Sequence, residues 1–439
     1  MTSILVSVSF GFVILAVLGV PIAFALLMVA VAGIWAALGN LEAAVTVLSQ
    51  AAFGGLRDFV FIVIPLFTVM GLLLGRCGAA GDLFNVVNRR LHGVPGRLAV
   101  ATIGGNAIFA AVTGVGLASL IAFAGIAYPE MRRHEYRRDY AMGCIAGSSV
   151  LGLLIPPSVI MIVWAILTEQ SVGALFIAGI GPGLLLAALY VVYATLSVRI
   201  NPDLAPQDHE ISEESSASRV ERRREAMGAM GVLALILLVL GGIYGGIFSP
   251  TEAAAFGTLG AYVFALLRGV RSQEMIDVVV KAGLATAPIM ILILAALVYS
   301  RFLALLGVPD LVKSGLGGLG LGENGIFFVM ILIWLIMGMF VDSLSILLLT
   351  VPIFWPIAQG WEMDPLTFAL VGVMVIEAGI LSPPFGLGIF AVQAAVRDPD
   401  AGLAQAYYGC IPYMVMILIA AAIVFLAPPI ATFLPAMML

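Results

Sequence analysis

Long uncharged apolar stretches recur along this chain, and no other feature restricts its fold as strongly. A helix that crosses a bilayer needs about 20 apolar residues, and backbone groups in lipid must be satisfied within the protein. Of the 439 residues, 62% are hydrophobic and 10% are charged. The apolar runs, some of them broken, are 4–38, 59–74, 98–128, 141–167, 172–198, 226–248, 253–267, 282–306, 326–355, 366–396 and 406–426. We therefore predict an all-α polytopic membrane protein with about ten to twelve segments in the bilayer.

Two of these runs are interrupted by nearly the same six residues. GLLIPP occupies 152–157 and GILSPP occupies 379–384. A proline inside a helix lacks an N–H and collides with the carbonyl four residues earlier. We therefore expect four free carbonyl oxygens, those of Gly152, Leu153, Gly379 and Ile380. In lipid, such breaks are tolerated only where they are buried in protein or line a watery cavity, so both are candidates for a binding site.

One spacing relates the two halves of the chain. An offset of 227 residues takes Pro129 to Pro356, Gly152 to Gly379, Leu154 to Leu381 and the Pro-Pro pair Pro156–Pro157 to Pro383–Pro384. A long polar stretch lies between the halves. The predicted parts are N-terminal scaffold helices with an amphipathic segment (1–57), a first repeat (58–198), a cytoplasmic polar linker (199–225), central scaffold helices (226–280) and a second repeat (281–439).

Arginines indicate that the two repeats are inverted. The loop after Pro129 carries Arg132, Arg133, Arg137 and Arg138, whereas its counterpart at 359–365 carries Glu362 and Asp364 and no basic residue. Because basic loops stay in the cytoplasm, we expect these two loops on opposite sides of the membrane. The other arginines also fall on the cytoplasmic side if 98–128 and 326–355 are re-entrant hairpins, each followed by a broken helix, 141–167 or 366–396. These arginines are Arg89, Arg90, Arg97, Arg268, Arg271 and those of the linker.

Inverted repeats with paired hairpins and broken helices are typical of secondary transporters. The hairpin tips read TGVGLAS at 113–119 and VDSLS at 341–345. Since Na⁺ prefers oxygen ligands, which unwound backbone and hydroxyls supply, we predict one sodium site per repeat. The first comprises Thr113, Gly114, Gly116, Ser148, Ser149, Gly152 and Pro156. The second comprises Asp342, Ser343, Ser345, Gly379, Ser382, Pro383 and Gly386. The alternative is that these small residues only allow close helix packing.

Three acidic residues lie inside or beside the apolar runs. Glu377 and Asp342 are ionisable groups at depth, which favours a functional role, although each could instead be a structural hydrogen-bonding group. Glu252 in SPTEAA is interpreted as a first-turn acid of a helix whose N-cap is Thr251 or Ser249.

Helix N-termini beyond each break, near Ser158 and Phe385, direct positive dipole ends toward a shared cavity and favour an anionic substrate. Candidates for lining it are Ser119, Pro157, Ser158, Glu377 and Pro384. We expect no enzyme and no cofactor apart from the coupling sodium: the Lys313-Ser314 pair lacks the P-loop pattern, and GSSVLG around Ser149 is not a nucleophile elbow.

Histidines and cysteines carry no expected metal role. His92, His134 and His209 occur in polar segments and are predicted to be solvated. Cys77, Cys144 and Cys410 lack C-x-x-C spacing and are predicted to be small buried hydrophobic residues. We expect no cleaved signal peptide, since neither Lys nor Arg precedes the first apolar run.

Four motifs resemble the large membrane subunit of TRAP (tripartite ATP-independent periplasmic) transporters, the DctM type. They are GLLIPPSVIM, GGIYGGIFSPTEAAA (241–255), GMFVDSLSILLLTVPIFWP (338–356) and IEAGILSPPFGLGIF (376–390), and the resemblance covers essentially the whole chain. It implies an uptake system of the bacterial inner membrane, driven by a sodium gradient through an elevator-like movement. Its partners would be a periplasmic substrate-binding protein and a separate small four-helix membrane subunit.

The resemblance also bears on the site. Family substrates are mostly carboxylates, such as C4-dicarboxylates and sugar acids, and the sodium ligands lie in the hairpin tips and proline breaks. The first tip departs from the usual SGSSVAT, with Thr113, Val115, Gly116 and Ser119 replacing several of its residues, and Ser343 stands where proline is common. Two other readings stay open: a stand-alone divalent-anion/sodium symporter, and a channel or membrane scaffold. The sequence does not name the carboxylate.

Overall fold

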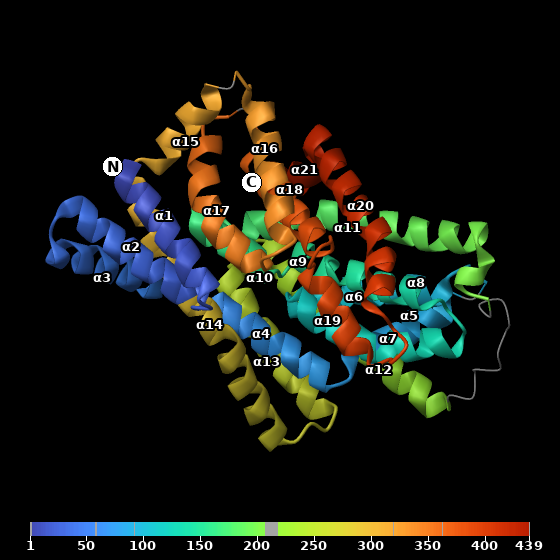
Figure 1. Cartoon of the computed structure of the whole chain (residues 1–439). Coiled ribbons are helices and arrows are strands. Elements are labelled where there is room, and N and C mark those ends of the chain that lie inside the picture. Colours follow the sequence, from blue (N-terminus) through green and yellow to red (C-terminus); the bar gives the residue numbers. More distant parts are fainter. Residues whose placement is uncertain are drawn as a thin grey trace.

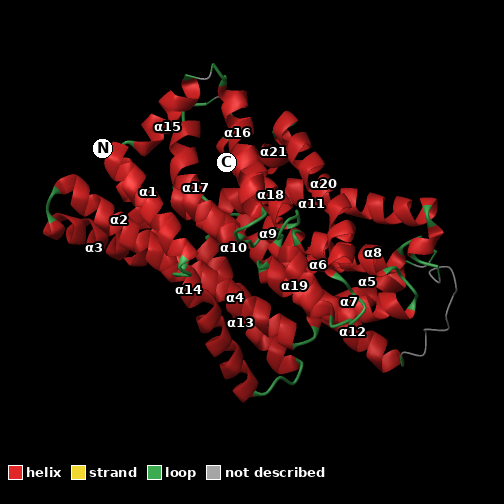
Figure 2. Cartoon of the chain, viewed as in Figure 1, coloured by secondary structure: helices red, strands yellow, loops and turns green. Residues whose placement is uncertain are grey.

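The structure is a computed structural model that describes residues 2–57, 59–91, 93–206, 218–318, 320–361 and 363–438. Within these ranges every regular element is a helix, and Figure 2 shows helices joined only by loops. The all-α prediction is therefore confirmed for the described part of the chain. Three residues named above, His92, His209 and Glu362, lie outside the described residues.

The helices before the polar linker comprise α1 to α11. They are α1 (Thr2–Val17), α2 (Ile22–Leu38), α3 (Leu41–Arg57), η1 (Phe59–Ile62), α4 (Val63–Arg76), α5 (Ala79–Arg90), α6 (Arg97–Thr113), α7 (Gly116–Arg133), α8 (Arg138–Ser149), α9 (Leu151–Leu154), α10 (Val159–Thr168) and α11 (Val172–Ile200). The apolar run 4–38 forms two helices, because Gly19 adopts a positive φ and Pro21 stands immediately before α2.

The later helices begin with a short turn, η2 (Pro202–Leu204). They are α12 (Arg219–Tyr244), α13 (Pro250–Leu267), α14 (Ser272–Leu305), α15 (Val308–Gly317), α16 (Glu323–Gly338), α17 (Ser343–Ala358), α18 (Pro365–Ile380), α19 (Leu387–Val396), α20 (Leu403–Leu426) and α21 (Pro429–Met438). Ser218 and Glu221 form a capping box, so α12 begins within the stretch predicted as linker.

Six described helices are long and apolar enough to cross a membrane. They are Phe59–Arg76, Val172–Ile200, Arg219–Tyr244, Pro250–Leu267, Ser272–Leu305 and Leu403–Leu426. A seventh span is obtained if Arg138–Leu154 and Val159–Thr168, which meet at a bend of 40°, count together. Shorter apolar helices include α16, α17, α18 and α19. The structure is thus consistent with the predicted polytopic membrane protein, and the shorter helices fall in the predicted hairpins and second broken helix.

The order of helices repeats with the same offset as the prolines. Moving α7 by 227 residues gives 343–360, and α17 spans Ser343–Ala358. Moving α10 gives 386–395, and α19 spans Leu387–Val396. The pairs α6 and α16, and α8–α9 and α18, correspond in the same way. The offset therefore relates whole helix–break–helix units and is not confined to prolines.

Helices from the two halves cross closely in the middle of the molecule. A Cβ added to Gly143 of α8 would lie only 2.0 Å from the carbonyl oxygen of Gly409 in α20, and one on Gly147 would lie 2.3 Å from the Tyr413 ring. Small residues at such crossings let helix backbones approach in a membrane protein. The units that carry the breaks are thereby packed into one body, with α1–α3 at the opposite end of the molecule in Figure 1.

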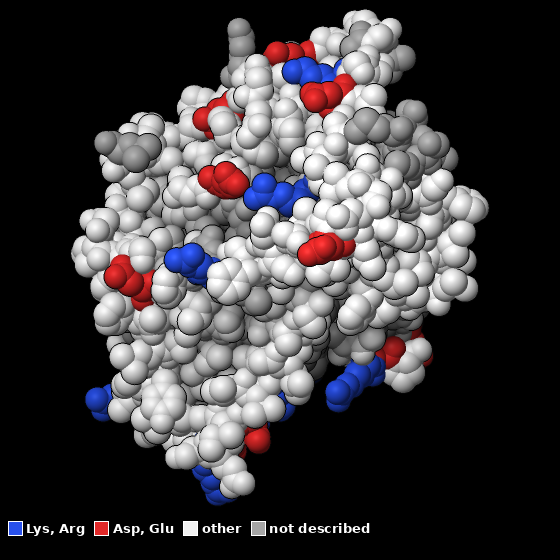
Figure 3. All heavy atoms as spheres, turned by 90° about the vertical axis from the view of Figure 1, so that its left-hand side faces the viewer, with Lys and Arg blue, Asp and Glu red and all other residues white. Residues whose placement is uncertain are grey.

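Polar interactions with the loop after α19 also connect the same two halves at one end. Tyr128 donates a hydrogen bond to Asp398 at 2.7 Å, and Arg138 lies 3.0 Å from Asp398 and 2.8 Å from Asp400. The Tyr128 hydrogen bond is the main reason that the pKa of Asp398 lies below its ordinary value, with smaller contributions from the Asp400 amide and Arg138. On the face shown in Figure 3, the surface is largely uncharged, with small groups of charged side chains on a white background.

The structure corrects one histidine prediction. His134 is only 5% exposed, and its Nε2 lies 3.6 Å from Glu130. It follows the last turn of α7, where its backbone N–H bonds to the Glu130 carbonyl, and this C-terminal turn buries the ring. The cysteine prediction is confirmed for Cys144 and Cys410, which are buried, whereas Cys77 is half-buried.

Candidate functional site

The first hairpin tip lies directly on the first break. The α6–α7 connection consists of Gly114, with φ of +64°, and the extended Val115. Val159, the first residue of α10 beyond the break, donates its backbone N–H to the Gly114 carbonyl at 3.2 Å. A Cβ on Gly114 would lie 2.6 Å from the carbonyl oxygen of Pro157, so the tip can sit here only with glycine at this position.

The second half makes a similar contact, although its acceptor, Met339, stands two residues before the position that the offset of 227 relates to Gly114. Gly386, which is related to Val159 by the offset of 227, donates its backbone N–H to the Met339 carbonyl at 3.1 Å, just past the end of α16. Close backbone packing supports this arrangement, because a Cβ on Gly338 would lie 2.6 Å from the Cα of Gly379. In each half, a residue beyond the break therefore bonds to the hairpin of that half, at the first tip or just before the second tip.

Two of the four carbonyls predicted to be free are hydrogen-bonded. The Leu153 carbonyl accepts from the Ser158 hydroxyl at 2.6 Å, and the Gly379 carbonyl accepts from the hydroxyl and the amide of Ser382 at 2.6 and 2.9 Å. The prediction was wrong for these two, because each break carries a serine within five residues that reaches back to the exposed end of the helix.

Hydroxyls of the first site keep oxygen lone pairs available. The hydroxyl of Ser149 donates to the Ala146 carbonyl at 2.7 Å, and that of Thr113 donates to the Phe109 carbonyl at 3.1 Å. A hydroxyl that donates its one proton still presents two lone pairs, so both can accept or coordinate. Ser149 also lies beside the tip, since a Cβ on Gly116 would be 3.1 Å from its carbonyl oxygen.

Asn106 is a residue of this site that the sequence reasoning missed. Its side chain is fully buried, donates to the Ser148 hydroxyl at 2.6 Å and accepts from the Ser119 hydroxyl. One amide therefore connects α6, α7 and α8 beneath the tip. A lone asparagine within the uncharged run 98–128 was the available signal.

The second site is built around two carboxylates. Asp342 caps α17 and accepts from the amide of Ser345 at 3.0 Å and from its hydroxyl at 2.5 Å. Glu377 is 2% exposed and accepts from the Ser343 hydroxyl at 2.5 Å. Both acids thus have the structural hydrogen bonds that the sequence left as an alternative. The cap prediction for Glu252 is confirmed, with Ser249 as the N-cap.

The two breaks differ in exposure. Pro156, Pro157 and Ser158 are buried, whereas Pro383, Pro384 and Phe385 are exposed. Ser158 is the N-cap of α10 and accepts from the Met161 amide, so its hydroxyl is already used twice. At the second break, Tyr407 of α20 donates to the carbonyls of Pro384 and Phe385, a contact that no local pattern in the sequence indicates.

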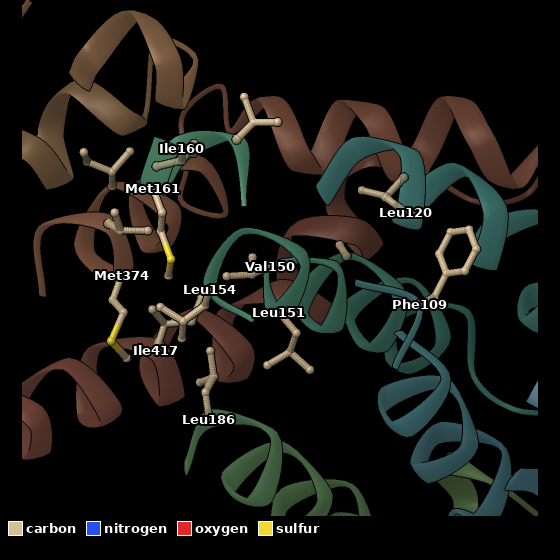
Figure 4. Packing of buried hydrophobic residues seen from close by; sticks show 14 of the residues in the cluster. Phe109, Leu120, Val150, Leu151, Leu154, Ile160, Met161, Leu186, Met374 and Ile417 are labelled. Atoms are coloured by element: carbon tan, nitrogen blue, oxygen red, sulfur yellow. The ribbon is translucent and has the colours of Figure 1, made fainter. Parts of the chain in front are cut away.

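Apolar packing surrounds the first break. Figure 4 shows Leu151 and Leu154 of α9 between Leu186 of α11 and helices of the second half, which carry Met374 and Ile417. Farther along α10, the Trp164 ring lies 6.0 Å from that of Trp334 and 5.8 Å from that of Phe368. The break is therefore held by packing from both halves. In the described part of the chain, no group of three or more His, Cys, Asp or Glu side chains could hold a metal ion.

Comparison with protein families identifies a match over nearly the whole chain. Residues 10–430 match the DctM component of the tripartite ATP-independent periplasmic transporters. This chain belongs to the DctM family. The resemblance inferred from the four motifs is thereby confirmed, and a DctM protein is a component of a transporter that is tripartite by its family name.

Two relatives and one solved structure illustrate the similarity. This DctM protein is 32% identical to the ectoine/5-hydroxyectoine TRAP transporter large permease of Ruegeria pomeroyi, over 96% of each chain. It is 32% identical to the C4-dicarboxylate TRAP transporter large permease of Pseudomonas aeruginosa, over 86% of this chain and 87% of the relative. The YdaH transporter of Alcanivorax borkumensis has a similar fold, with a TM-score of 0.56, 14% identity and coverage of 90% of this chain and 88% of its own.

The family and the helices together give the cellular location. Relatives of this DctM protein are membrane permeases, and its own described helices include six that are long enough to cross a bilayer. It is a multi-pass protein of the inner membrane.

Proposed function

We propose that this DctM protein is the translocating subunit of a sodium-coupled, ATP-independent importer of a small carboxylate. Two backbone hydrogen bonds from related donors to the hairpin of the same half, from Val159 to Gly114 and from Gly386 to Met339, carry the proposal. Each fixes a hairpin tip against a broken helix, which is the arrangement expected of a transporter site formed from unwound backbone.

Sodium would bind once in each half. The first ion would use tip carbonyls of 113–116 with the free lone pairs of Ser149, and the second would use Asp342, Ser345 and the backbone around Gly379. These oxygens suit a hard cation. The Leu153 carbonyl accepts one hydrogen bond and keeps a second lone pair, so Ser158 does not exclude coordination there, whereas the Gly379 carbonyl already accepts twice from Ser382.

The substrate would be a carboxylate such as a C4-dicarboxylate or a sugar acid. Ectoine and C4-dicarboxylates, named for the two relatives, both carry carboxylates. The N-terminus of α19 begins at the exposed break and directs its dipole toward an anion there. We also propose that Ser119, Glu377 and Pro384 lie near this substrate.

The partners and the movement also belong to the proposal. The small four-helix subunit and a periplasmic binding protein would complete the system. The opposite charge of the loops at 132–138 and 359–365 supports an inverted orientation of the two repeats, with 98–128 and 326–355 re-entrant. The units joined through α8 and α20 would then move together, as an elevator, against a scaffold that contains α2, α12, α13 and α14.

The test is uptake into proteoliposomes that contain this protein and its small partner. Candidate carboxylates are supplied with and without an inward sodium gradient, and with and without the binding protein. Uptake that requires both sodium and loaded binding protein is the expected result. Uptake without binding protein would support a stand-alone divalent-anion/sodium symporter, and flux indifferent to sodium would support a channel.

A further inference from the structure

A cavity of about 630 Å³ lies away from both breaks. It is formed by α3, η1, the α10–α11 turn, the start of α13 and the later part of α14, and we call it the α3–α14 cavity. Its described polar lining residues are Gln50, Glu169, Gln170, Ser171, Ser249, Thr251 and Arg301. Its volume lies in the range of pockets that take small organic ligands, roughly 300–1,000 Å³.

Among the described residues of this lining, Arg301 supplies the only arginine or lysine side chain. Leu297 and Arg301 are four residues apart in α14, so they lie on one helix face. Gly55 brings α3 close to that face, because a Cβ there would lie 2.9 Å from methyl groups of Leu294 and Leu297. Arg301 has no hydrogen-bond or ion-pair partner among the described residues. A guanidinium with five free donors at a cavity wall is suited to a planar carboxylate.

Gln170 provides an independent sign of a missing partner. Both polar atoms of its side-chain amide are buried, and neither has a hydrogen-bond partner in the described part of the chain. An unsatisfied buried amide is costly, and rotation toward a ligand in the adjoining cavity would relieve that cost. Glutamine offers both a donor and an acceptor, so it can bond to a carboxylate or to a neighbouring hydroxyl or amine.

Two long helices begin at this cavity. Ser171 caps α11 and Ser249 caps α13, and both serines line it. Their positive dipole ends, that of α13 partly offset by its capping acid Glu252, add to the charge of Arg301, while Glu169 is the one acidic side chain among the described residues of the lining. The lining therefore offers a cationic centre with a single acidic group, which fits a carboxylate that also carries a hydroxyl or a basic group.

The α3–α14 cavity is separate from the sodium sites. The helix α10 runs from the first break at Ser158 to Glu169 at the cavity. Ten helical residues cover about 15 Å. None of the tip or break residues assigned above lines the cavity. A ligand here would thus be one helix length from the place where the tips meet the breaks.

Arginines place the cavity on the outer side. The helix α13 ends at Arg268 and α14 begins after Arg271, while α11 ends at Arg199 and Ile200 before the polar linker. Basic ends face the cytoplasm, so the opposite ends, where the cavity lies, face outward. That is the side on which a binding protein would deliver substrate.

We propose that the α3–α14 cavity is an outer binding site that receives the carboxylate of a small substrate on Arg301 before translocation. The direction of transport and the substrate class rest on the function proposed above. Carboxylate binding itself rests on the unpartnered Arg301, the unsatisfied Gln170 amide and the two helix N-termini. Acidic side chains of a binding protein offer the same chemistry, and the experiment separates this source from free substrate.

The experiment uses a Gln50→Cys variant of the full chain in right-side-out vesicles. Gln50 is exposed and lines the cavity, whereas Cys144 and Cys410 are buried and Cys77 is half-buried, directly after Arg76 at the end of α4. The rate of labelling by a membrane-impermeant thiol reagent is measured with succinate, ectoine, sialic acid or chloride. At least one carboxylate should slow labelling, and chloride should not. Arg301→Gln should raise the concentration for half-protection by roughly tenfold or more.

Arg271→Gln is the matched control, because Arg271 is exposed just before the other end of α14 and should leave protection unchanged. Lack of protection by every carboxylate with Arg301 intact overturns the proposal, as does equal protection in Arg301→Gln. Protection only by added binding protein would assign the site to that protein's side chains and also overturns it. The readout needs no transport, so failed uptake with intact protection contradicts the proposed function alone.

Discussion

Replacing Gly114 by alanine tests the contact between the first tip and the first break. Alanine at the observed φ of +64° costs about 1–2 kcal/mol. Its Cβ would also lie 2.6 Å from the Pro157 carbonyl oxygen, and relieving such a contact by backbone movement costs about 1–3 kcal/mol more. If the docked tip forms the first sodium site, this second cost raises the sodium concentration for half-maximal uptake by roughly 5- to 150-fold.

Gly307→Ala is the control for backbone strain alone. Gly307 has the same φ of +64°, but a Cβ there would meet nothing within 4 Å. Sodium-dependent uptake into proteoliposomes is measured for both variants, with thermal unfolding in detergent as a check on folding. Gly307→Ala should lower stability by about 1–2 kcal/mol and leave sodium dependence unchanged. Equal sodium dependence in the two variants would refute the assignment of the tip to a sodium site.

Three further predictions concern the polar contacts. Ser345→Ala should raise the sodium concentration for half-maximal uptake severalfold, whereas the control Ser314→Ala, at an exposed serine, should leave it unchanged. An unchanged value for Ser345→Ala would contradict the second sodium site. Asn106→Leu should lower stability by about 1–3 kcal/mol, because it leaves the buried Ser119 hydroxyl without its acceptor, and unaltered thermal unfolding would argue against this network. Asp398→Asn should reduce thermal stability at neutral pH, and the deficit should begin to shrink near pH 4 and vanish only below the lowered pKa of Asp398, because a carboxylate whose pKa is lowered by folding contributes only while ionised; a deficit that persists at lower pH would contradict the role of charge.

Much of the helical layout could be predicted from the sequence. The expected segments 98–128 and 141–167 correspond to α6–α7 (97–133) and α8–α10 (138–168), because apolar runs, glycine tips and paired prolines are local signals. The offset of 227 between prolines also predicted which helices of the two halves correspond. Family membership followed from four motifs, since each combines a break or tip with its flanking helix.

Hydrogen-bond partners were harder to predict. Ser158 and Ser382 satisfy carbonyls of their own breaks, which the capping preferences of serine could have indicated. Tyr407 reaches the second break from another helix, so only the tertiary fold brings it there. The α3–α14 cavity depends on several helices distant in sequence, and Arg301 alone gave no sign of it.

The matching contacts of Val159 and Gly386 give this protein an internal reference. Two segments with different side chains, one with buried prolines and one with exposed prolines, each donate a backbone hydrogen bond to their own hairpin. Exchanging the segments 152–159 and 379–386 would therefore separate what the backbone path contributes from what the surrounding helices contribute. Because the chain contains two versions of the contact between a hairpin and a break, one half of the protein can serve as the reference for the other.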